Sequence, residues 1–207
     1  LRKMSGQGMM DCKKALEEAE GDIEKAMGLL RKKGLATLAK RTERETTEGA
    51  VVSKTGSGGK EVAMASLCCE TDFAANSDAF ISAAQLLADC TLICPADQGV
   101  DDLLQTVVNG KKYNDILTEA VSKTGEKIQV ADYIRYKLDG PGVIGLYIHF
   151  NKKVGTMVHI ATGGDSEAAA MQQAAVDIAM HITAAKPMAL HKGGISPDVI
   201  EKEKEIA

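Results

Sequence analysis

The sequence predicts an α+β protein, with a small N-terminal module of three helices followed by a core of two related halves, each an antiparallel sheet with helices. Two patterns and one recurrence predict this fold. Apolar residues stand at helical spacing up to residue 40, and they alternate with polar ones from Gly49 onward. The alternating pattern that begins at Gly49 returns at Gly142. With 44% apolar residues among 207, the chain can bury a core of this size.

The N-terminal module is predicted over residues 1–40, with a charged linker at 41–48. Gly21 offers a left-handed helix stop, and Asp22 offers a cap for the next helix, which is expected to end at Gly34. A short helical tail is expected before the first of these helices. Two helical stripes are apolar: Cys12, Ala15, Leu16 and Ala19, then Ile23, Ala26, Met27 and Leu30.

The first half of the core is predicted over residues 49–139. It begins with two strands around a Gly-rich hairpin, and the second strand places Ala63, Ala65 and Leu67 on one face. An apolar helix is expected over 78–90. Further helical segments, broken by the stretch NGKKYND, and a strand that ends in LDG follow.

The second half is predicted over residues 140–191. Gly142 lies 93 residues after Gly49, and the same displacement places Met64 on Met157 and Leu67 on Ile160. Strand, polar turn, strand and apolar helix recur in the same order, although few residues are identical. Residues 192–207 are predicted to be the start of a truncated helical segment.

Composition excludes several classes of protein. Because 25 basic residues face 29 acidic ones, the net charge of −4 gives the whole molecule no attraction for phosphate backbones. No apolar stretch approaches the length that a bilayer requires, so we expect a soluble protein without membrane contact. One local run, residues 31–44, carries six basic residues and one acidic residue. A solvated helix face is the ordinary meaning of such a run, ahead of an acidic partner and of nucleic acid.

No motif for metal or phosphate binding survives inspection. In KTGSGGKE, Lys54 stands where a phosphate loop requires its first glycine, and Glu61 stands where it requires serine or threonine, so a hairpin turn is favoured. The four histidines show no metal-binding spacing. His149, before a turn, and His181, on a helix, could share an exposed face, as structural residues or as contacts to a partner.

The five cysteines also lack metal spacing, and their number fits a reduced, cytoplasmic compartment. A nucleophile at Cys68 or Cys69 would need a lowered pKa, whereas the neighbouring Glu70 and Asp72 act in the opposite direction. We therefore expect no catalytic residues, no metal and no cofactor. The oligomeric state stays open, since edge strands and exposed cysteines could pair two copies as a homodimer within a larger complex.

The stretch CCETDFAANSDAF places one aromatic ring in a polar turn. Asp72 has a structural role available as the cap of the following helix. Phe73, one of three phenylalanines in a chain without tryptophan, has two readings. Either the ring belongs to the core, or it projects from a helix end and anchors a partner protein.

Four motifs, spread in order over essentially the whole chain, resemble the bacterial elongation factor Ts family. They are the opening LRKMSGQGMMDCKKALEEAEGDIEKAMGLLRKKG, the segment CETDFAAN, and the later LYIHFNKKVGTMV and IAMHITAAKP. Two features depart from the family pattern. Ala74 stands where valine usually follows the TDF triplet, and the family normally continues past SPDVIEKEKE into a helical hairpin and a C-terminal module.

This resemblance implies a guanine-nucleotide exchange factor that binds elongation factor Tu and promotes GDP release during translation elongation, and not an enzyme. It also implies that the opening module has a ubiquitin-associated-like fold and docks on the GTPase domain. The TDF segment would wedge into that domain, and the second half would touch a β-barrel domain of the partner. The implied partner-binding residues are Met10, Asp11, Thr71, Asp72, Phe73, Ala74, His149 and His181. The alternative is a helical adaptor that binds proteins without exchange activity.

Overall fold

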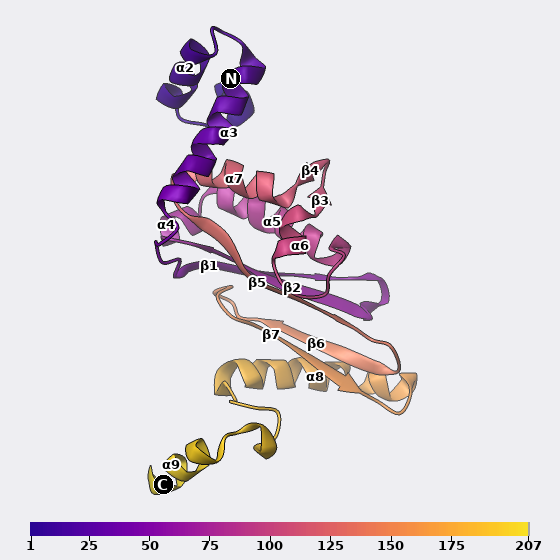
Figure 1. Ribbon diagram of the computed structural model, residues 1–207. Coiled ribbons are helices and arrows are strands. Elements are labelled where there is room, and N and C mark those ends of the chain that lie inside the picture. Colours follow the sequence, from indigo (N-terminus) through magenta and orange to yellow (C-terminus); the bar gives the residue numbers. More distant parts are fainter. Residues whose placement is uncertain (207) are drawn as a thin grey trace.

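The computed structural model describes residues 1–206, and at positions 38 and 206 it describes the backbone alone. Four layers form the body of the molecule (Figure 1): helices α5 and α7, a three-stranded sheet, a two-stranded sheet, and helix α8. The N-terminal helices extend from one end, and α9 lies at the other. Helices combined with small antiparallel sheets confirm the predicted α+β class.

The first three helices enclose a small core of their own, built on the predicted stripes. Its buried members are Cys12, Ala15, Ala19, Ala26 and Leu30. Asp22 caps the third helix as predicted, because its carboxylate accepts the Lys25 N–H at 3.0 Å. Ile23, however, is exposed rather than part of the buried stripe. The helices are α1 (Arg2–Ser5), α2 (Met9–Glu18) and α3 (Ile23–Lys40).

The prediction that Gly34 ends the third helix is wrong. Helix α3 continues to Lys40, because Gly34 lies against α7 (Tyr113–Thr124). A Cβ at Gly34 would lie 2.7 Å from the Thr118 carbonyl oxygen, so the missing side chain permits close helix packing. Residues 41–47 then form a turn and extended chain.

The three-stranded sheet has the order β1-β2-β5, and all its pairs are antiparallel. The Gly-rich stretch is the predicted hairpin turn, tightened by a short 3-10 helix. Ala63, Ala65 and Leu67 point into the main core, which confirms the predicted face. The elements of the first half are β1 (Glu48–Thr55), η1 (Ser57–Gly59), β2 (Glu61–Cys69), α4 (Asp72–Ala75), α5 (Asp78–Ile93), α6 (Asp101–Gln105), β3 (Val107–Val108), β4 (Lys111–Lys112), α7 and β5 (Ile128–Lys137).

The second half contains β6 (Gly142–Ile148), β7 (Gly155–Ala161) and α8 (Asp165–Ala185), followed by η2 (Lys192–Gly194) and α9 (Pro197–Ile206). The pairing of β6 with β7 reproduces the pairing of β1 with β2 after the displacement of 93 residues. Gly49 lies opposite Cys68, and Gly142 lies opposite Ala161. The two hairpins therefore share their register as well as the order of their elements.

Glycines permit close approach between the layers of the second half. A Cβ at Gly145 of β6 would lie 2.2 Å from the Ala175 carbonyl oxygen, so α8 packs directly on the strand backbone. A Cβ at Gly155 of β7 would lie 2.5 Å from the Met64 sulfur of the first sheet.

Within residues 1–206, no helix combines the length and apolar character that crossing a bilayer requires.

Candidate functional site

The TDF segment forms a tight turn between β2 and α5. Thr71 is extended and precedes the one-turn helix α4, and its Oγ1 accepts the Ala74 N–H at 3.2 Å. The prediction that Asp72 caps a helix is therefore wrong. Asp72 already lies inside α4, and its carboxylate accepts the neighbouring Phe73 N–H. The longer helix α5 is capped by Ser77.

The Glu126 carboxylate holds Thr71 from the loop between α7 and β5. Its Oε1 accepts the Thr71 hydroxyl at 2.8 Å, and its Oε2 accepts the Thr71 N–H at 3.1 Å. The Cys69 thiol donates to the Thr71 carbonyl at 3.2 Å. Because Thr71 is bonded through its backbone and its side chain, the start of α4 is fixed in position.

Glu70 provides a second attachment for the same turn. Its carboxylate accepts the Lys127 N–H at 2.7 Å and pairs with Arg41, which follows the end of α3. Burial alone would raise the pKa of Glu70, but the hydrogen bonds from Lys127 and Arg41 hold that pKa below its usual value. The linker after α3 and the α7–β5 loop thus both hold the turn.

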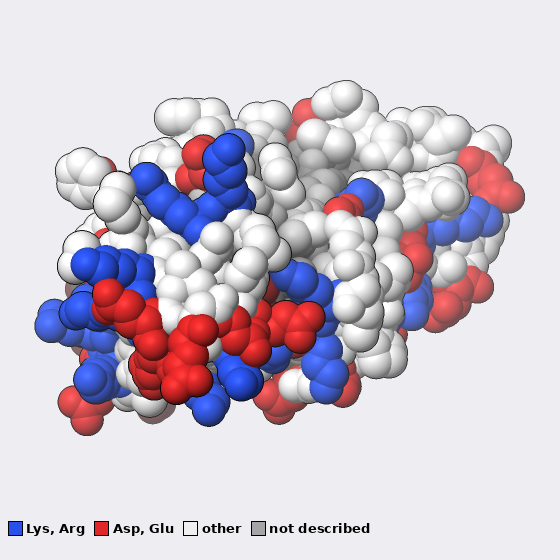
Figure 2. Space-filling view, turned by 90° about the horizontal axis from the view of Figure 1, so that it is seen from above, with Lys and Arg blue, Asp and Glu red and all other residues white. Residues whose placement is uncertain are grey.

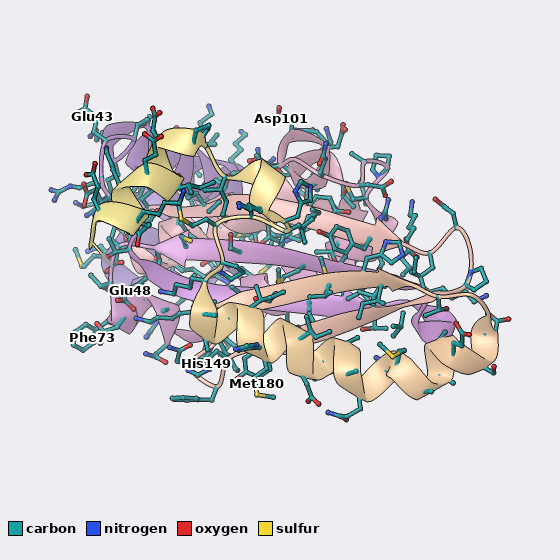
Figure 3. The ribbon with its side chains drawn as sticks, turned by 90° about the horizontal axis from the view of Figure 1, so that it is seen from below. Glu43, Glu48, Phe73, Asp101, His149 and Met180 are labelled. Atoms are coloured by element: carbon teal, nitrogen blue, oxygen red, sulfur yellow. The ribbon has the colours of Figure 1, made fainter. Side chains whose placement is uncertain are left out.

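Phe73 projects from this fixed turn into solvent. Its side chain is 83% exposed, whereas the next residue, Ala74, is buried in the main core. In Figure 3 the Phe73 ring points away from the body of the molecule. The reading of Phe73 as a core residue is therefore wrong. The ring has no role in packing and is available to a partner.

The other predicted site residues lie in two further places. Met10 and Asp11 begin α2, where Met10 is exposed and Asp11 pairs with Lys33. His149 follows β6, and His181 lies on the exposed side of α8. The Thr156 hydroxyl meets the Thr183 hydroxyl at 2.7 Å, which places the His181 end of α8 beside the start of β7. In Figure 1, α2, α4 and the β6–β7 turn follow one another along one side of the molecule.

Sequence reasoning missed Phe150 in the turn between β6 and β7. Its side chain is 86% exposed, and its ring lies against the His149 ring with a centroid distance of 4.4 Å. The signal was present in the sequence, since an aromatic residue in the polar stretch HFNKK repeats the feature that singles out Phe73.

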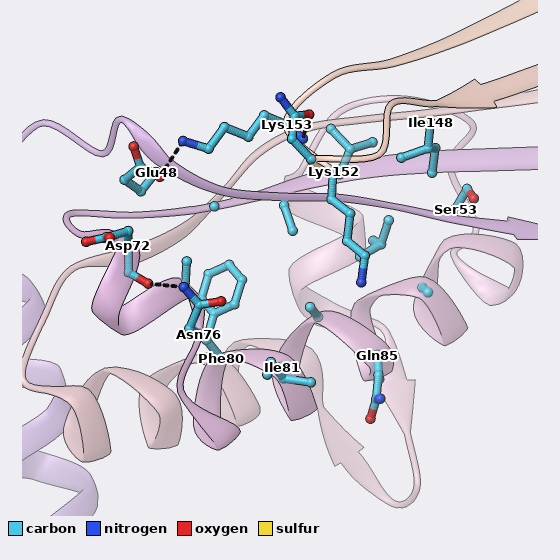
Figure 4. Close-up of a pocket in the computed structure, with 18 residues that line it drawn as sticks. Glu48, Ser53, Asp72, Asn76, Phe80, Ile81, Gln85, Ile148, Lys152 and Lys153 are labelled. Atoms are coloured by element: carbon cyan, nitrogen blue, oxygen red, sulfur yellow. Dashed lines mark hydrogen bonds and ion pairs between the residues drawn. The ribbon is translucent and has the colours of Figure 1, made fainter.

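A groove of about 550 Å³ lies between α4–α5 and the β6–β7 turn (Figure 4). Its floor is β1, the edge strand of the first sheet. Asp72 and Asn76 line one wall, and Ile148 and Asn151 line the other. The groove therefore separates the TDF turn from the turn that carries Phe150.

The cysteines are unsuited to nucleophilic chemistry. Burial, and after it the Glu126 carboxylate, raise the pKa of Cys69 to about 12, and burial also raises the pKa of Cys68. Cys12, Cys69, Cys90 and Cys94 are buried and Cys68 is partly buried, and the pairing of two copies through cysteines stays a prediction. Among residues 1–206, no group of three His, Cys, Asp or Glu side chains is arranged to hold a metal ion.

Comparison with known proteins gives one consistent result. The family model described as "Elongation factor TS" matches residues 70–207. The chain is 41% identical to "Elongation factor Ts" of Desulfovibrio desulfuricans and 39% identical to that of Chlorobium phaeobacteroides, and in both cases 100% of this chain aligns with 71% of the relative. The protein of the same name from Nitratiruptor sp. is 36% identical, with 100% of this chain on 68% of the relative. The chain belongs to the elongation factor Ts family.

Proposed function

We propose that this chain is a guanine-nucleotide exchange factor, which binds elongation factor Tu and promotes the release of GDP during translation elongation. Membership of the elongation factor Ts family supports this function. The structural observation that carries it is the exposed Phe73 ring, held on a turn that Glu126 and Glu70 attach to the rest of the protein.

The physical basis of exchange is thermodynamic linkage. A factor that binds the nucleotide-free GTPase more tightly than the GDP-bound form must weaken the affinity for GDP by the same ratio. No covalent bond is made or broken in this process. Exchange therefore needs an inserted structural element and not a catalytic residue, so the protein acts without a cofactor and is not an enzyme.

Each residue of the TDF segment has a separate role in this proposal. Phe73 is the wedge that enters the GTPase domain. Thr71 and Ala74 attach the helix that carries it, one through Glu126 and the other through the core. Asp72 is exposed beside the ring and is a candidate for a polar contact with the same domain.

The remaining predicted contacts extend the interface at both ends. The N-terminal module, 1–40, has its own small core and is proposed to be ubiquitin-associated-like and to dock on the GTPase domain through Met10 and Asp11. His181 is a proposed contact to a β-barrel domain of the partner, and His149 is proposed to belong to the same partner-binding surface. The shared register of the two hairpins supports the division of the core into halves at 49–139 and 140–191.

The net charge of −4 fits a protein partner rather than nucleic acid. In the view of Figure 2, acidic and basic side chains are interleaved and do not gather into a basic surface. Since exchange takes place where translation occurs, a cytoplasmic location follows from the proposed function. A homodimer within a larger complex stays a proposal.

The test is release of fluorescent GDP from elongation factor Tu. Catalytic amounts of this chain, with unlabelled GDP in excess, are expected to accelerate the loss of fluorescence in a concentration-dependent manner. A helical adaptor would bind elongation factor Tu in a sedimentation or calorimetric assay and leave the release rate unchanged. That outcome would replace exchange with the adaptor function.

A further inference from the structure

Two of the three phenylalanines in this chain expose their rings almost completely. Phe73 is 83% exposed and Phe150 is 86% exposed, whereas Phe80 is buried at 1%. Both exposed rings stand in turns, where neither contributes to a core. A large aromatic side chain that is held in solvent by a folded turn is typical of a residue that carries interface energy.

The Phe150 ring is held in place by its neighbours. The His149 ring lies against it at a centroid distance of 4.4 Å and an interplanar angle of 50°. The Tyr147 hydroxyl and His149 Nδ1 are hydrogen-bonded at 3.0 Å, which fixes the imidazole in turn. His149 thus connects the strand residue Tyr147 to the exposed ring.

The turn that carries Phe150 is attached to the edge strand of the first sheet. The Lys152 carbonyl accepts the Val51 N–H at 2.7 Å, and the Lys153 ammonium pairs with Glu48 at 2.6 Å (Figure 4). Helix α4, which carries Phe73, packs against the same strand. The helix and the turn that carry the two rings are therefore both attached to β1.

The residues next to the two rings line the same groove, although neither ring lines it itself. Asp72, next to Phe73, lines one wall, and Asn151, next to Phe150, lines the other. In Figure 3 the labelled Phe73 and His149 lie along one margin of the molecule. A single partner seated over the groove would meet both rings together.

We propose that Phe150 is a second aromatic anchor for the same GTPase and that His149 is a positioning residue that seats its ring. This inference rests on the proposed exchange function. With Phe73 engaged, binding of Phe150 to another part of the same partner becomes an intramolecular step, so it raises affinity without acting on the nucleotide site. The complementary surface of the partner has two apolar pockets, one for each ring. A ridge between these pockets enters the groove.

The first experiment titrates the full chain and its Phe150→Ala variant against elongation factor Tu loaded with fluorescent GDP. The concentration for half-maximal release is expected to rise at least about tenfold, whereas the release rate at saturation changes less than about twofold. Leu190→Ala is the matched control, because Leu190 is 99% exposed in the segment after α8. Thermal melting checks that each variant is folded.

The outcomes separate this inference from the proposed function. If the unaltered chain does not accelerate GDP release, the exchange function itself is wrong, and this inference is wrong with it. If the unaltered chain is active and Phe150→Ala titrates like Leu190→Ala, only the second anchor is wrong. If Phe150→Ala lowers the saturating rate as much as the affinity, Phe150 acts on the nucleotide site and is not a separate anchor.

A second experiment tests the positioning role of His149. His149→Ala is introduced into the unaltered chain and into the Phe150→Ala variant, as a double-mutant cycle. We expect weaker binding in the first background and no further weakening in the second, because the ring that His149 seats is then absent. Equal losses in both backgrounds would show that His149 contacts the GTPase directly and would overturn the positioning role.

Discussion

The Glu126 carboxylate accepts hydrogen bonds from both the hydroxyl and the N–H of Thr71, which lies 55 residues earlier in the chain. This contact joins the α7–β5 loop to the turn that presents Phe73. The position of the exposed ring therefore depends on a residue that lies outside the TDF segment, and this dependence can be tested without altering the segment itself.

Glu126→Gln should reduce exchange although Phe73 itself is not substituted. The neutral amide retains one acceptor oxygen and places a donor NH₂ group against one of the two Thr71 donors, so the turn loosens. Hydrogen bonds to charged groups contribute about 1.5–3 kcal/mol, and we expect a loss of stability at the lower end of this range together with weaker binding of elongation factor Tu. Chemical denaturation and GDP release measure the two effects.

The matched control is Glu119→Gln, which removes the charge of an exposed carboxylate that pairs with Lys111 on the surface. An exposed pair of this kind contributes about 0–1 kcal/mol, so the control should behave like the unaltered chain. Equal behaviour of the two variants would mean that Glu126 does not hold the turn.

The stability of the turn should depend on pH through Glu70. The pKa of its carboxyl is lowered from an ordinary value of 4.5, so the folded state binds this proton less readily than the unfolded state. The contribution of Glu70 to stability is therefore complete above pH 4.5 and is lost as pH falls through the lowered folded-state pKa. We expect the difference in unfolding free energy between the unaltered chain and Glu70→Gln to shrink over this interval.

Urea denaturation between pH 7 and pH 3 measures that difference, and the other carboxyl groups largely cancel because both proteins contain them. A difference that stays constant with pH would show that the ion pair with Arg41 and the hydrogen bond from Lys127 do not stabilise the charged form.

Arg135 is predicted to be a major determinant of stability in the first half. Its buried guanidinium donates to the carbonyl group of Leu92 in the last turn of α5 and to that of Ala96 just beyond the helix, and it pairs with Asp97. Arg135→Met removes the donor to the Leu92 carbonyl, whereas the Ala96 carbonyl keeps the Tyr133 hydroxyl as a donor. An unpaired group costs about 1–3 kcal/mol, so we expect a total loss within this range. Thermal and chemical unfolding provide the measurement.

Lys137→Met is the comparison for Arg135→Met, because Lys137 contacts the same Asp97 from a half-exposed position. This variant should lose less than about 1 kcal/mol. If both variants were equally destabilised, the ion pairs with Asp97 and not the bonds to the end of α5 would be responsible.

The sequence was sufficient to predict those parts of the fold whose pattern is local and repeated. The two hairpins were predicted with the displacement that their register shows, because alternation and glycine-rich turns act over a few residues. The cap at Asp22 was found for the same reason. Gly34 was misread because a glycine can serve a tertiary contact as well as a helix end, and only the position of α7 distinguishes the two.

The candidate site was predicted in its centre and missed at its margins. The TDF segment was recognised, but assigning the cap to Asp72 failed by one residue, since the capping residue is the one before the first helical turn. The attachments through Glu126 and Arg41 could not be predicted, because they join residues that are far apart in the chain. The relation of Phe150 to Phe73 likewise depends on how the second half packs on β1.

Gly145→Ala should loosen the second half selectively. Its Cβ would lie 2.2 Å from the Ala175 carbonyl oxygen, so α8 must move away from β6. Overpacking of this kind typically costs about 1–3 kcal/mol. Hydrogen exchange should show loss of protection in β6, β7 and α8, whereas the first half retains its protection.

Gly28→Ala is the control for Gly145→Ala, and its expected effect on stability has the opposite sign. Gly28 lies inside α3 with no atom within 4 Å of an added Cβ, so this variant should gain up to about 1 kcal/mol from higher helix propensity. If Gly145→Ala were as stable as the unaltered chain, α8 could move without cost and close packing on β6 would not hold it.

Phe73→Ala and Phe80→Ala provide the most direct test of the exposed ring, because the two phenylalanines are seven residues apart and differ in burial, 83% against 1%. Phe80→Ala creates a cavity in the main core and should cost about 3–5 kcal/mol. Phe73→Ala removes a ring that contacts mainly solvent, so its melting temperature should stay within a few degrees of that of the unaltered chain. Its affinity for elongation factor Tu should fall about 30-fold, which corresponds to about 2 kcal/mol for an interface anchor, and GDP release should slow even at saturation because the wedge is absent.

Phe80→Ala should show the reverse, with low stability but ordinary exchange by the fraction that stays folded. Release assays at equal concentrations of folded protein, determined by circular dichroism, distinguish the two variants. Ordinary release by a folded Phe73→Ala protein would show that the exposed ring is not the element that opens the nucleotide site.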